Sequence, residues 1–256
     1  DAVPHLVETS AKDWNDQPQS RAITKRMQGL IKRYPRRYVV CEATAKPQDY
    51  GDPALCGGAF AFGYVQHFVG AAMGKAESVQ EVAQFYMKAR PTMATFLSSH
   101  DIFAGKRLWD QVGGDEVRYK LAAAGYLLQP GTPFVYYGEE VGQAGVPGLS
   151  GDLPLRSPMS GLRNRLPSIA RGSYEGAFAQ GLVAGWQRRL GREHTLVLIN
   201  YGTGGADVQV PSLPAGARLT PVWPLTAPAA RTGTDGQAAL LLPPQSVQVM
   251  RISPVR

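Results

Sequence analysis

Short, uninterrupted apolar runs alternate with helix-type segments over the first 140 residues of the chain. Tyr38–Cys41 and Phe134–Tyr137 contain no charged position, a pattern typical of strands buried on both faces. Residues 59–69 and 92–97 are two further strand candidates. Alternation of strands and helices with short connections predicts βα units around a parallel sheet.

Helical periodicity supports the segments between these strands. In residues 17–34 apolar side chains recur on one face, and Pro35 ends the segment. The members of that face are Ala22, Ile23, Met27, Leu30 and Ile31. Ser78 and Glu81 form a capping-box pattern at the start of a second helix. Residues 115–128 are predicted to form a third helix, which ends before Pro130.

The composition and the hydrophobic pattern of the sequence change after about residue 145. Pro, Gly and Ser become frequent up to about residue 175, and short alternating segments separated by turn residues follow. These segments are Leu182–Trp186, Thr195–Asn200, Asp207–Val210, Leu219–Trp223, Ala238–Leu242 and Ser246–Ile252. They predict an antiparallel β-sandwich. We therefore expect an α/β domain over residues 1–168 and an all-β domain over residues 169–256, with the boundary within 167–172.

Composition and charge exclude several classes of protein. The chain is 18% charged and 44% hydrophobic, as in ordinary globular domains. Its net charge is +7, but the basic residues are scattered, and the densest run, residues 32–37, follows a predicted helix. Cations are favoured at a helix C-terminus, so we predict no nucleic-acid partner. No apolar stretch approaches about 18 residues, so no membrane span is predicted.

The two cysteines, Cys41 and Cys56, are too few for a disulfide scaffold or a thiolate zinc site. One disulfide and two buried thiols both fit the sequence. For Cys41, which ends an apolar run, a structural role is favoured over that of a nucleophile. The compartment stays open, with a secreted or periplasmic location slightly favoured over a cytoplasmic one.

Carboxylates and histidines stand where the predicted strands end. These residues are Asp1, His5, Glu42, His100, Asp101, Glu139 and Glu140. In parallel α/β folds the carboxyl ends of the strands collect the active groups. Clustered carboxylates suit glycoside hydrolysis, in which one attacks the anomeric carbon and another protonates the leaving oxygen. A metal site is the rival use of such residues, but no His-Glu-x-x-His motif or cysteine pairs support it.

Four segments, in order, resemble motifs of the α-amylase family of glycoside hydrolases. Residues 1–5 resemble the second half of an Arg-x-Asp-x-x-x-His motif at the fourth barrel strand, and residues 38–43 resemble the fifth-strand motif. Residues 95–101 resemble the seventh-strand motif, and residues 131–140 resemble the eighth. The resemblance covers about residues 1–160. It implies the C-terminal half of a TIM (β/α)8 barrel followed by the family's β-sandwich.

The resemblance also implies roles for matching residues. Asp1 would be the nucleophile, Glu42 the general acid and then base, and Asp101 the third carboxylate. His5 and His100 would bind sugar hydroxyls. The implied activity is retaining hydrolysis of α-glucosidic bonds in starch-type glucans or malto-oligosaccharides. Retaining chemistry predicts that the first two carboxyl groups lie about 5–5.5 Å apart.

The departures from the family pattern carry expectations of their own. The chain has no counterpart of the first three barrel strands or of the motif's arginine, and Ser99 replaces the usual asparagine. A half-barrel leaves sheet edges unpaired, so we expect this chain alone to be weakly folded or inactive, and a missing N-terminal barrel half to be its partner. No cofactor is required. Calcium is expected only in a full-length parent, because the segment that usually supplies most ligands has no counterpart here.

Two sets of alternatives stay open. Trp109 is the candidate for stacking on a sugar ring, whereas Trp186, Trp223 and His67 are expected to be core residues and His194 to lie in a hairpin turn. In function, an α-glucosyl transferase or trehalose synthase-like enzyme would use the same carboxylates on another acceptor. An inactive glucan-binding fragment is the non-enzyme reading.

Overall fold

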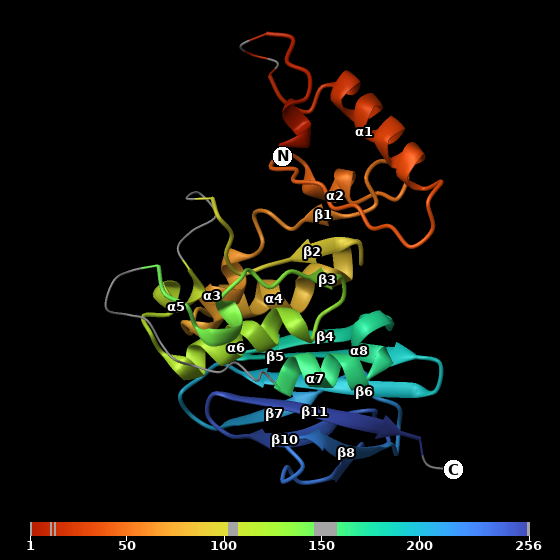
Figure 1. The fold of residues 1–256 in the computed structure, drawn as a ribbon. Helices are drawn as coiled ribbons and strands as arrows, with labels where there is room; N and C mark the ends of the chain where they lie inside the picture. The colour runs from red at the N-terminus through yellow and green to blue at the C-terminus, as the bar shows by residue number, and fades with distance from the viewer. Residues whose placement is uncertain (1, 11, 13, 102–106, 146–157, 255–256) are drawn as a thin grey trace. The chain divides into compact units, whose positions relative to one another are not determined.

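The computed structural model describes residues 2–10, 12, 14–101, 107–145 and 158–254. These residues form two compact units, which Figure 1 shows in one view. Unit 1 comprises Asp1–Val65, Ala89–Phe96 and Gly131–Phe134, and unit 2 comprises Gln66–Lys88, Leu97–Pro130 and Val135–Arg256. The chain therefore passes between the units several times. The division predicted at residues 168/169 stays a prediction.

Unit 1 contains a small parallel sheet. Its strands β1 (Ala59–Phe60), β2 (Met93–Thr95) and β3 (Thr132–Pro133) pair in the order β1-β2-β3. The register pairs Ala59 with Met93 and Ala94 with Thr132. Helices occupy both connections, so the prediction of βα units around a parallel sheet is confirmed.

The edge of this sheet differs from the predicted strands. Tyr38–Cys41 contributes a single parallel bridge, from Cys41 to Ala59, and the Tyr38 side chain is exposed. In residues 59–69, β1 ends at Phe60, where the chain turns: the Phe62 backbone N–H donates to the Phe60 carbonyl at 2.9 Å, and Gly63 follows with a left-handed φ of 77°.

The third predicted strand is also displaced. Pairing stops at Pro133, and Phe134 makes the last backbone bond to Thr95, N to O at 2.7 Å. Beyond it Val135 and Tyr137 are exposed, so the prediction of a strand buried on both faces over Phe134–Tyr137 is wrong.

The helix predicted over residues 17–34 is confirmed as α1 (Pro18–Ile31), but its buried face is not the predicted one. Ser20 and Thr24 are buried, whereas Met27 and Leu30 are exposed. The polar face is buried because its hydrogen bonds are satisfied. The Ser20 hydroxyl accepts from the Val7 backbone N–H at 2.9 Å, and the Thr24 hydroxyl donates to the Ser20 carbonyl at 2.8 Å.

Two connections fix the loops of unit 1, which also contains η1 (Val3–His5) and α2 (Pro47–Tyr50). Cys41 and Cys56 form a disulfide, which decides between the two alternatives left open by the sequence. Asp16 accepts from Arg21 Nε at 2.8 Å and contacts Lys46 Nζ at 2.9 Å. The Arg21 hydrogen bond is the main cause that lowers the pKa of Asp16 to about 2.

Unit 2 holds the remaining helices: α3 (Gln66–Ala72), α4 (Ala76–Lys88), α5 (Leu108–Gln111), α6 (Glu116–Leu127), α7 (Pro158–Arg165), α8 (Pro167–Arg171) and η3 (Glu139–Val141). Helix α6 confirms the prediction for residues 115–128, with Asp115 as its N-cap. The capping box is wrong, because α4 begins before Ser78. That buried hydroxyl lies 3.4 Å from Nδ1 of His67, which is on α3 rather than on a strand.

The C-terminal part of unit 2 is antiparallel. A six-stranded sheet has the order β4-β5-β6-β11-β8-β9, and β10 pairs with β7. The strands are β4 (Glu175–Gln180), β5 (Val183–Leu190), β6 (Glu193–Asn200), β7 (Ala206–Val210), β8 (Arg218–Trp223), β9 (Ala230–Arg231), β10 (Ala238–Leu242) and β11 (Ser246–Ser253). All six predicted segments are strands, and β4 and β9 were not predicted. Side chains from both sheets share one apolar core.

The helices α4 and α6 pack on the other side of this antiparallel sheet (Figure 1). Trp186 on β5 is fully buried and its indole N–H donates to the Leu128 carbonyl at 3.2 Å. Tyr174 donates its hydroxyl to the Ala83 carbonyl at 2.8 Å. The prediction that Trp186 is a core residue is confirmed. His194 is the second residue of β6, just past the hairpin turn, and is buried with Nε2 2.9 Å from the Gln187 side-chain oxygen.

Candidate functional site

The first group of candidate residues lies in unit 1. Glu42 directly follows the bridge at Cys41, and its carbonyl accepts a hydrogen bond from the Val3 backbone N–H at 3.0 Å. The first described residues therefore lie beside the predicted acid/base. His5, at the end of η1, stacks its ring on Trp14 with centroids 4.8 Å apart. Asp1, the predicted nucleophile, lies outside the described residues.

The second group lies in unit 2, directly after β2. His100 Nε2 is 3.4 Å from Asp101 Oδ1, and the His100 side chain is 77% exposed against 27% for Asp101. The Asp101 backbone N–H donates to the Ser99 hydroxyl at 3.2 Å. Ser99, which departs from the family motif, thus closes the short turn that presents Asp101.

Trp109, the predicted sugar-stacking residue, is largely buried. It lies on α5, is only 8% exposed, and packs edge-to-face on Tyr119 with centroids 5.6 Å apart. Its ring therefore packs in the core beside α6, and the role of Trp109 as a substrate-binding residue stays a prediction.

Exposed aromatic surface is supplied instead by the segment after β3. The guanidinium of Arg107 lies 4.7 Å from the ring centroid of Tyr136 and 4.4 Å from that of Tyr137. Arg107 also donates to the Tyr137 carbonyl. This cation–π contact holds two tyrosine rings next to the chain segment that leads to Glu139. The Tyr137 ring is 64% exposed.

Glu139 is the functional candidate whose environment the sequence did not reveal. It is 4% exposed, and its carboxylate accepts from the Ser98 hydroxyl and from the Tyr136 backbone N–H, the latter at 3.2 Å. Burial raises the pKa of Glu139 to about 7, against the hydrogen bonds from Ser98 and Tyr136, which lower it. Its place after a predicted strand was visible in the sequence, but its burial was not.

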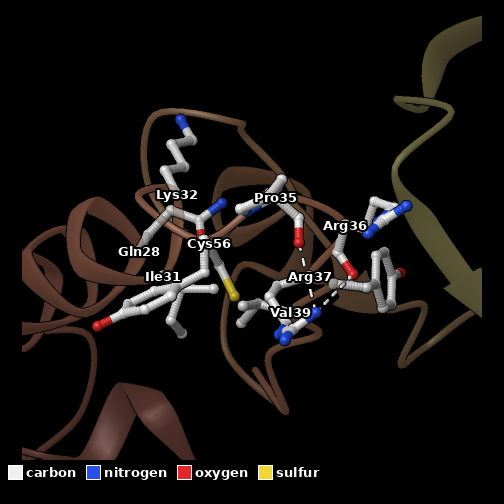
Figure 2. Close-up of a pocket in the computed structure, with 11 residues that line it drawn as sticks. Gln28, Ile31, Lys32, Pro35, Arg36, Arg37, Val39 and Cys56 are labelled. Atoms are coloured by element: carbon white, nitrogen blue, oxygen red, sulfur yellow. Dashed lines mark hydrogen bonds between the residues drawn. The ribbon is translucent and has the colours of Figure 1, made fainter.

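A separate cavity of about 310 Å³ lies in unit 1 at the end of α1 (Figure 2). Its lining includes the cations Lys32, Arg36 and Arg37 and no acidic residue. Lys32, the C-cap of α1, donates to the Pro53 carbonyl at 2.6 Å, so the basic run indeed ends a helix. Without a carboxylate in its wall, this cavity does not supply the groups that acid–base cleavage of a glycoside needs.

Two features are absent from the described part of the chain. Within it, no group of three or more His, Cys, Asp or Glu side chains could hold a metal ion. No helix in the same residues is long and apolar enough to cross a membrane.

Two relatives in sequence are known enzymes. Trehalose synthase from Thermus thermophilus is 25% identical over 223 residues, covering 70% of this chain and 22% of the relative. Neopullulanase 2 from Thermoactinomyces vulgaris is 30% identical over 124 residues, covering 41% of this chain and 20% of the relative. The chain thus spans about a fifth of the length of each. No family model matches the chain.

Solved structures share the fold. An α-amylase from Geobacillus thermoleovorans, complexed with acarbose, aligns with a TM-score of 0.73 at 18% identity over 92% of this chain and 58% of that one. A debranching enzyme from Nostoc punctiforme aligns with a TM-score of 0.74 at 21% identity over 91% and 56%. These likenesses establish the fold and fit the order of the four motifs. Together with the two sequence relatives, they support the resemblance of this chain to the α-amylase family of glycoside hydrolases.

Proposed function

We propose that the chain carries part of a retaining glycoside hydrolase that acts on α-glucosidic bonds of starch-type glucans or malto-oligosaccharides. The observation that carries this proposal is the position of Glu42. Glu42 directly follows the parallel bridge at Cys41, where the chain leaves the sheet. The backbone carbonyl of Glu42 accepts a hydrogen bond from the Val3 backbone N–H. In this fold class, catalytic groups stand at that end of the strands.

The proposal includes the layout of the fold. We assign the parallel sheet and its helices to the C-terminal half of a (β/α)8 barrel, and the antiparallel sheets to a β-sandwich. Supporting this layout, the bridge at Cys41 and strands β1, β2 and β3 follow one another in spatial order as they do along the chain. That is the order in which strands of a barrel wall succeed one another.

In the proposed reaction, Asp1 attacks the anomeric carbon while Glu42 gives a proton to the leaving glycosidic oxygen. The glycosyl–Asp1 ester is then hydrolysed by a water molecule that loses its proton to Glu42. Asp101 holds hydroxyls of the reacting sugar, and His5 and His100 donate further hydrogen bonds to it. The carboxyl groups carry both proton transfer and the covalent intermediate, so the reaction needs no cofactor.

The names of the relatives support an α-glucan substrate. One solved neighbour is an α-amylase complexed with acarbose, and one sequence relative is a neopullulanase. The described residues of unit 2 add an exposed tyrosine ring, Tyr137, which suits contact with a sugar face.

Release of reducing sugar from soluble starch and maltose tests the proposal. We expect Glu42→Gln to lower kcat by about 10²–10⁴-fold, because the general acid is lost. Glu81→Gln, an exposed carboxylate on α4, is the matched control and should leave the rate unchanged. Where the wild type releases reducing sugar, an equal rate for Glu42→Gln would overturn the assignment of the acid.

A transfer reaction is the second candidate, because a sequence relative is a trehalose synthase. It would use the same glycosyl–Asp1 ester and a sugar hydroxyl in place of water. Product analysis with labelled maltose separates the two: labelled trehalose indicates transfer, and labelled glucose alone indicates hydrolysis. Binding to starch without release of any product would favour a glucan-binding fragment.

A further inference from the structure

Glu139 is a buried carboxylate for which the proposed reaction has no use. It opens η3 after Gly138, whose φ of 83° lies in the left-handed region and turns the chain inward. The side chain is 4% exposed, and the Tyr119 hydroxyl on α6 donates to the Glu139 carbonyl. Burying a carboxyl group is costly, so its environment must offset the loss of hydration.

The carboxylate connects two segments that are far apart in sequence. One oxygen accepts the Ser98 hydroxyl, and the other accepts the Tyr136 backbone N–H at 3.2 Å. The Ser98 backbone N–H also hydrogen-bonds to the carboxylate. Ser98 is itself 2% exposed, so the bridge is sealed from solvent. It therefore ties the segment after β2 to the segment after β3.

The turn that carries two of the candidate site residues directly follows Ser98 and this hydrogen bond. Asp101 and His100 lie only two and three residues beyond Ser98, and the Asp101 backbone N–H donates to the Ser99 hydroxyl at 3.2 Å. The side chain of His100 is 77% exposed, and its ion pair within the described residues is with Asp101. The buried anchor of this short segment is thus the Glu139–Ser98 hydrogen bond.

The hydrogen-bond donors around the Glu139 side chain favour a carboxylate over an amide at this position. When the carboxyl group is ionised, both of its oxygens accept, from the Ser98 hydroxyl and from two backbone N–H groups. An amide would turn an NH₂ group towards one of those N–H groups. The charged and titratable groups facing the carboxylate are Arg107 before α5 and Tyr119 and Tyr126 on α6.

We propose that Glu139 is a positioning residue that sets the conformation of Ser99–Asp101 through its hydrogen bond to Ser98. This effect on conformation involves only residues of unit 2. Its consequence for catalysis, the placement of Asp101 and His100 on the sugar, rests on the proposed function.

The test uses Glu139→Gln and Ser98→Ala in the full chain, with Glu116→Gln, an exposed carboxylate paired with Lys120, as the control. Backbone ¹⁵N–¹H spectra report the Ser99, His100 and Asp101 amides without any need for activity. We expect both variants to shift these three amides and to speed their hydrogen exchange at least tenfold, while the control leaves them unchanged. Unchanged amides in a folded Ser98→Ala variant would overturn the proposal.

The double variant supplies a readout that a merely structural role would not move. If Glu139 acts through Ser98, the pair Glu139→Gln/Ser98→Ala should shift the amides of Ser99–Asp101 no further than Glu139→Gln alone. Additive shifts would contradict the proposed route. If Glu139→Gln does not fold, the wild type is titrated with pH instead. The chemical shifts of amides 99–101 should then change with the same midpoint as the shift of the Glu139 carboxyl carbon, and different midpoints would overturn the proposal.

Activity distinguishes this proposal from the proposed function. If the wild type cleaves malto-oligosaccharides, Ser98→Ala should lower kcat at least tenfold with a smaller change in KM. Wild-type chain without glucan cleavage or binding would defeat the proposed function, while the amide shifts would still decide whether Glu139 positions Ser99–Asp101.

Discussion

Glu139 makes the stability of unit 2 depend on pH in a direction unusual for a carboxyl group. Burial raises its pKa from 4.5 to about 7, so the folded state binds the proton more tightly than the unfolded chain. Its contribution is full below pH 4.5 and is lost as pH rises towards 7. The shift corresponds to about 3 kcal/mol of unfolding free energy.

We expect urea unfolding between pH 4.5 and 8 to show this loss in the wild type and not in Glu139→Gln. His194 contributes the opposite slope, because burial lowers its pKa below 6.5. The difference between wild type and variant is therefore the informative quantity, and Glu116→Gln should follow the wild type. The unfolding free energy of the wild type minus that of Glu139→Gln should increase as pH falls from 8 to 4.5, and a decrease would contradict the expected sign.

At the scale of single elements, α6 depends on its N-cap. Asp115 Oδ1 accepts from the backbone N–H groups of Val117 and Arg118 at 2.9 and 3.0 Å. Asp115→Ala leaves both donors without this acceptor and should lower the unfolding free energy by about 1 kcal/mol in urea titration. Asp115→Asn keeps a cap oxygen and should lose much less. Equal losses in the two variants would show that charge, not capping, matters.

The Cys41–Cys56 disulfide closes a loop next to the parallel sheet. The two cysteines are 15 residues apart, and a loop of that length is stabilised by about 3 kcal/mol when it is crosslinked. We expect Cys41→Ala/Cys56→Ala to unfold at a lower urea concentration than the wild type. Dithiothreitol should lower the urea midpoint of the wild type and leave that of the double variant unchanged. A wild-type midpoint unaffected by reductant would contradict the expectation.

At the scale of the whole molecule, exposed apolar side chains on α1 favour self-association. Met27 and Leu30 are 51% and 54% exposed, and exposed apolar surface of this kind promotes contact between chains. Met27→Gln/Leu30→Gln should reduce oligomers in sedimentation velocity at several concentrations, with a change in stability within about 0.5 kcal/mol. Val117→Gln, also exposed, is the control. Identical sedimentation of wild type and double variant would argue against this surface.

The sequence by itself determined the succession of elements and the resemblance to a family. Hydrophobic periodicity found α1, α6 and six of the antiparallel strands, because their side-chain repeat depends on local geometry. The four motifs, with Glu42 and His100–Asp101 at strand ends, predicted a resemblance to the α-amylase family, and the sequence relatives support that resemblance. The roles of Asp1, Glu42 and Asp101 stay predictions that the kinetic test addresses.

Only the tertiary structure decided which faces are buried. It placed Ser20 and Thr24 inside and Met27 outside, and it buried Trp109 in the core. Periodicity shows that a helix has two faces, but hydrogen-bond partners such as Val7 lie far away in sequence. The environment of Glu139 has the same origin. Its pKa and its bridge depend on Ser98, 41 residues earlier, and on desolvation, neither of which is encoded in local sequence.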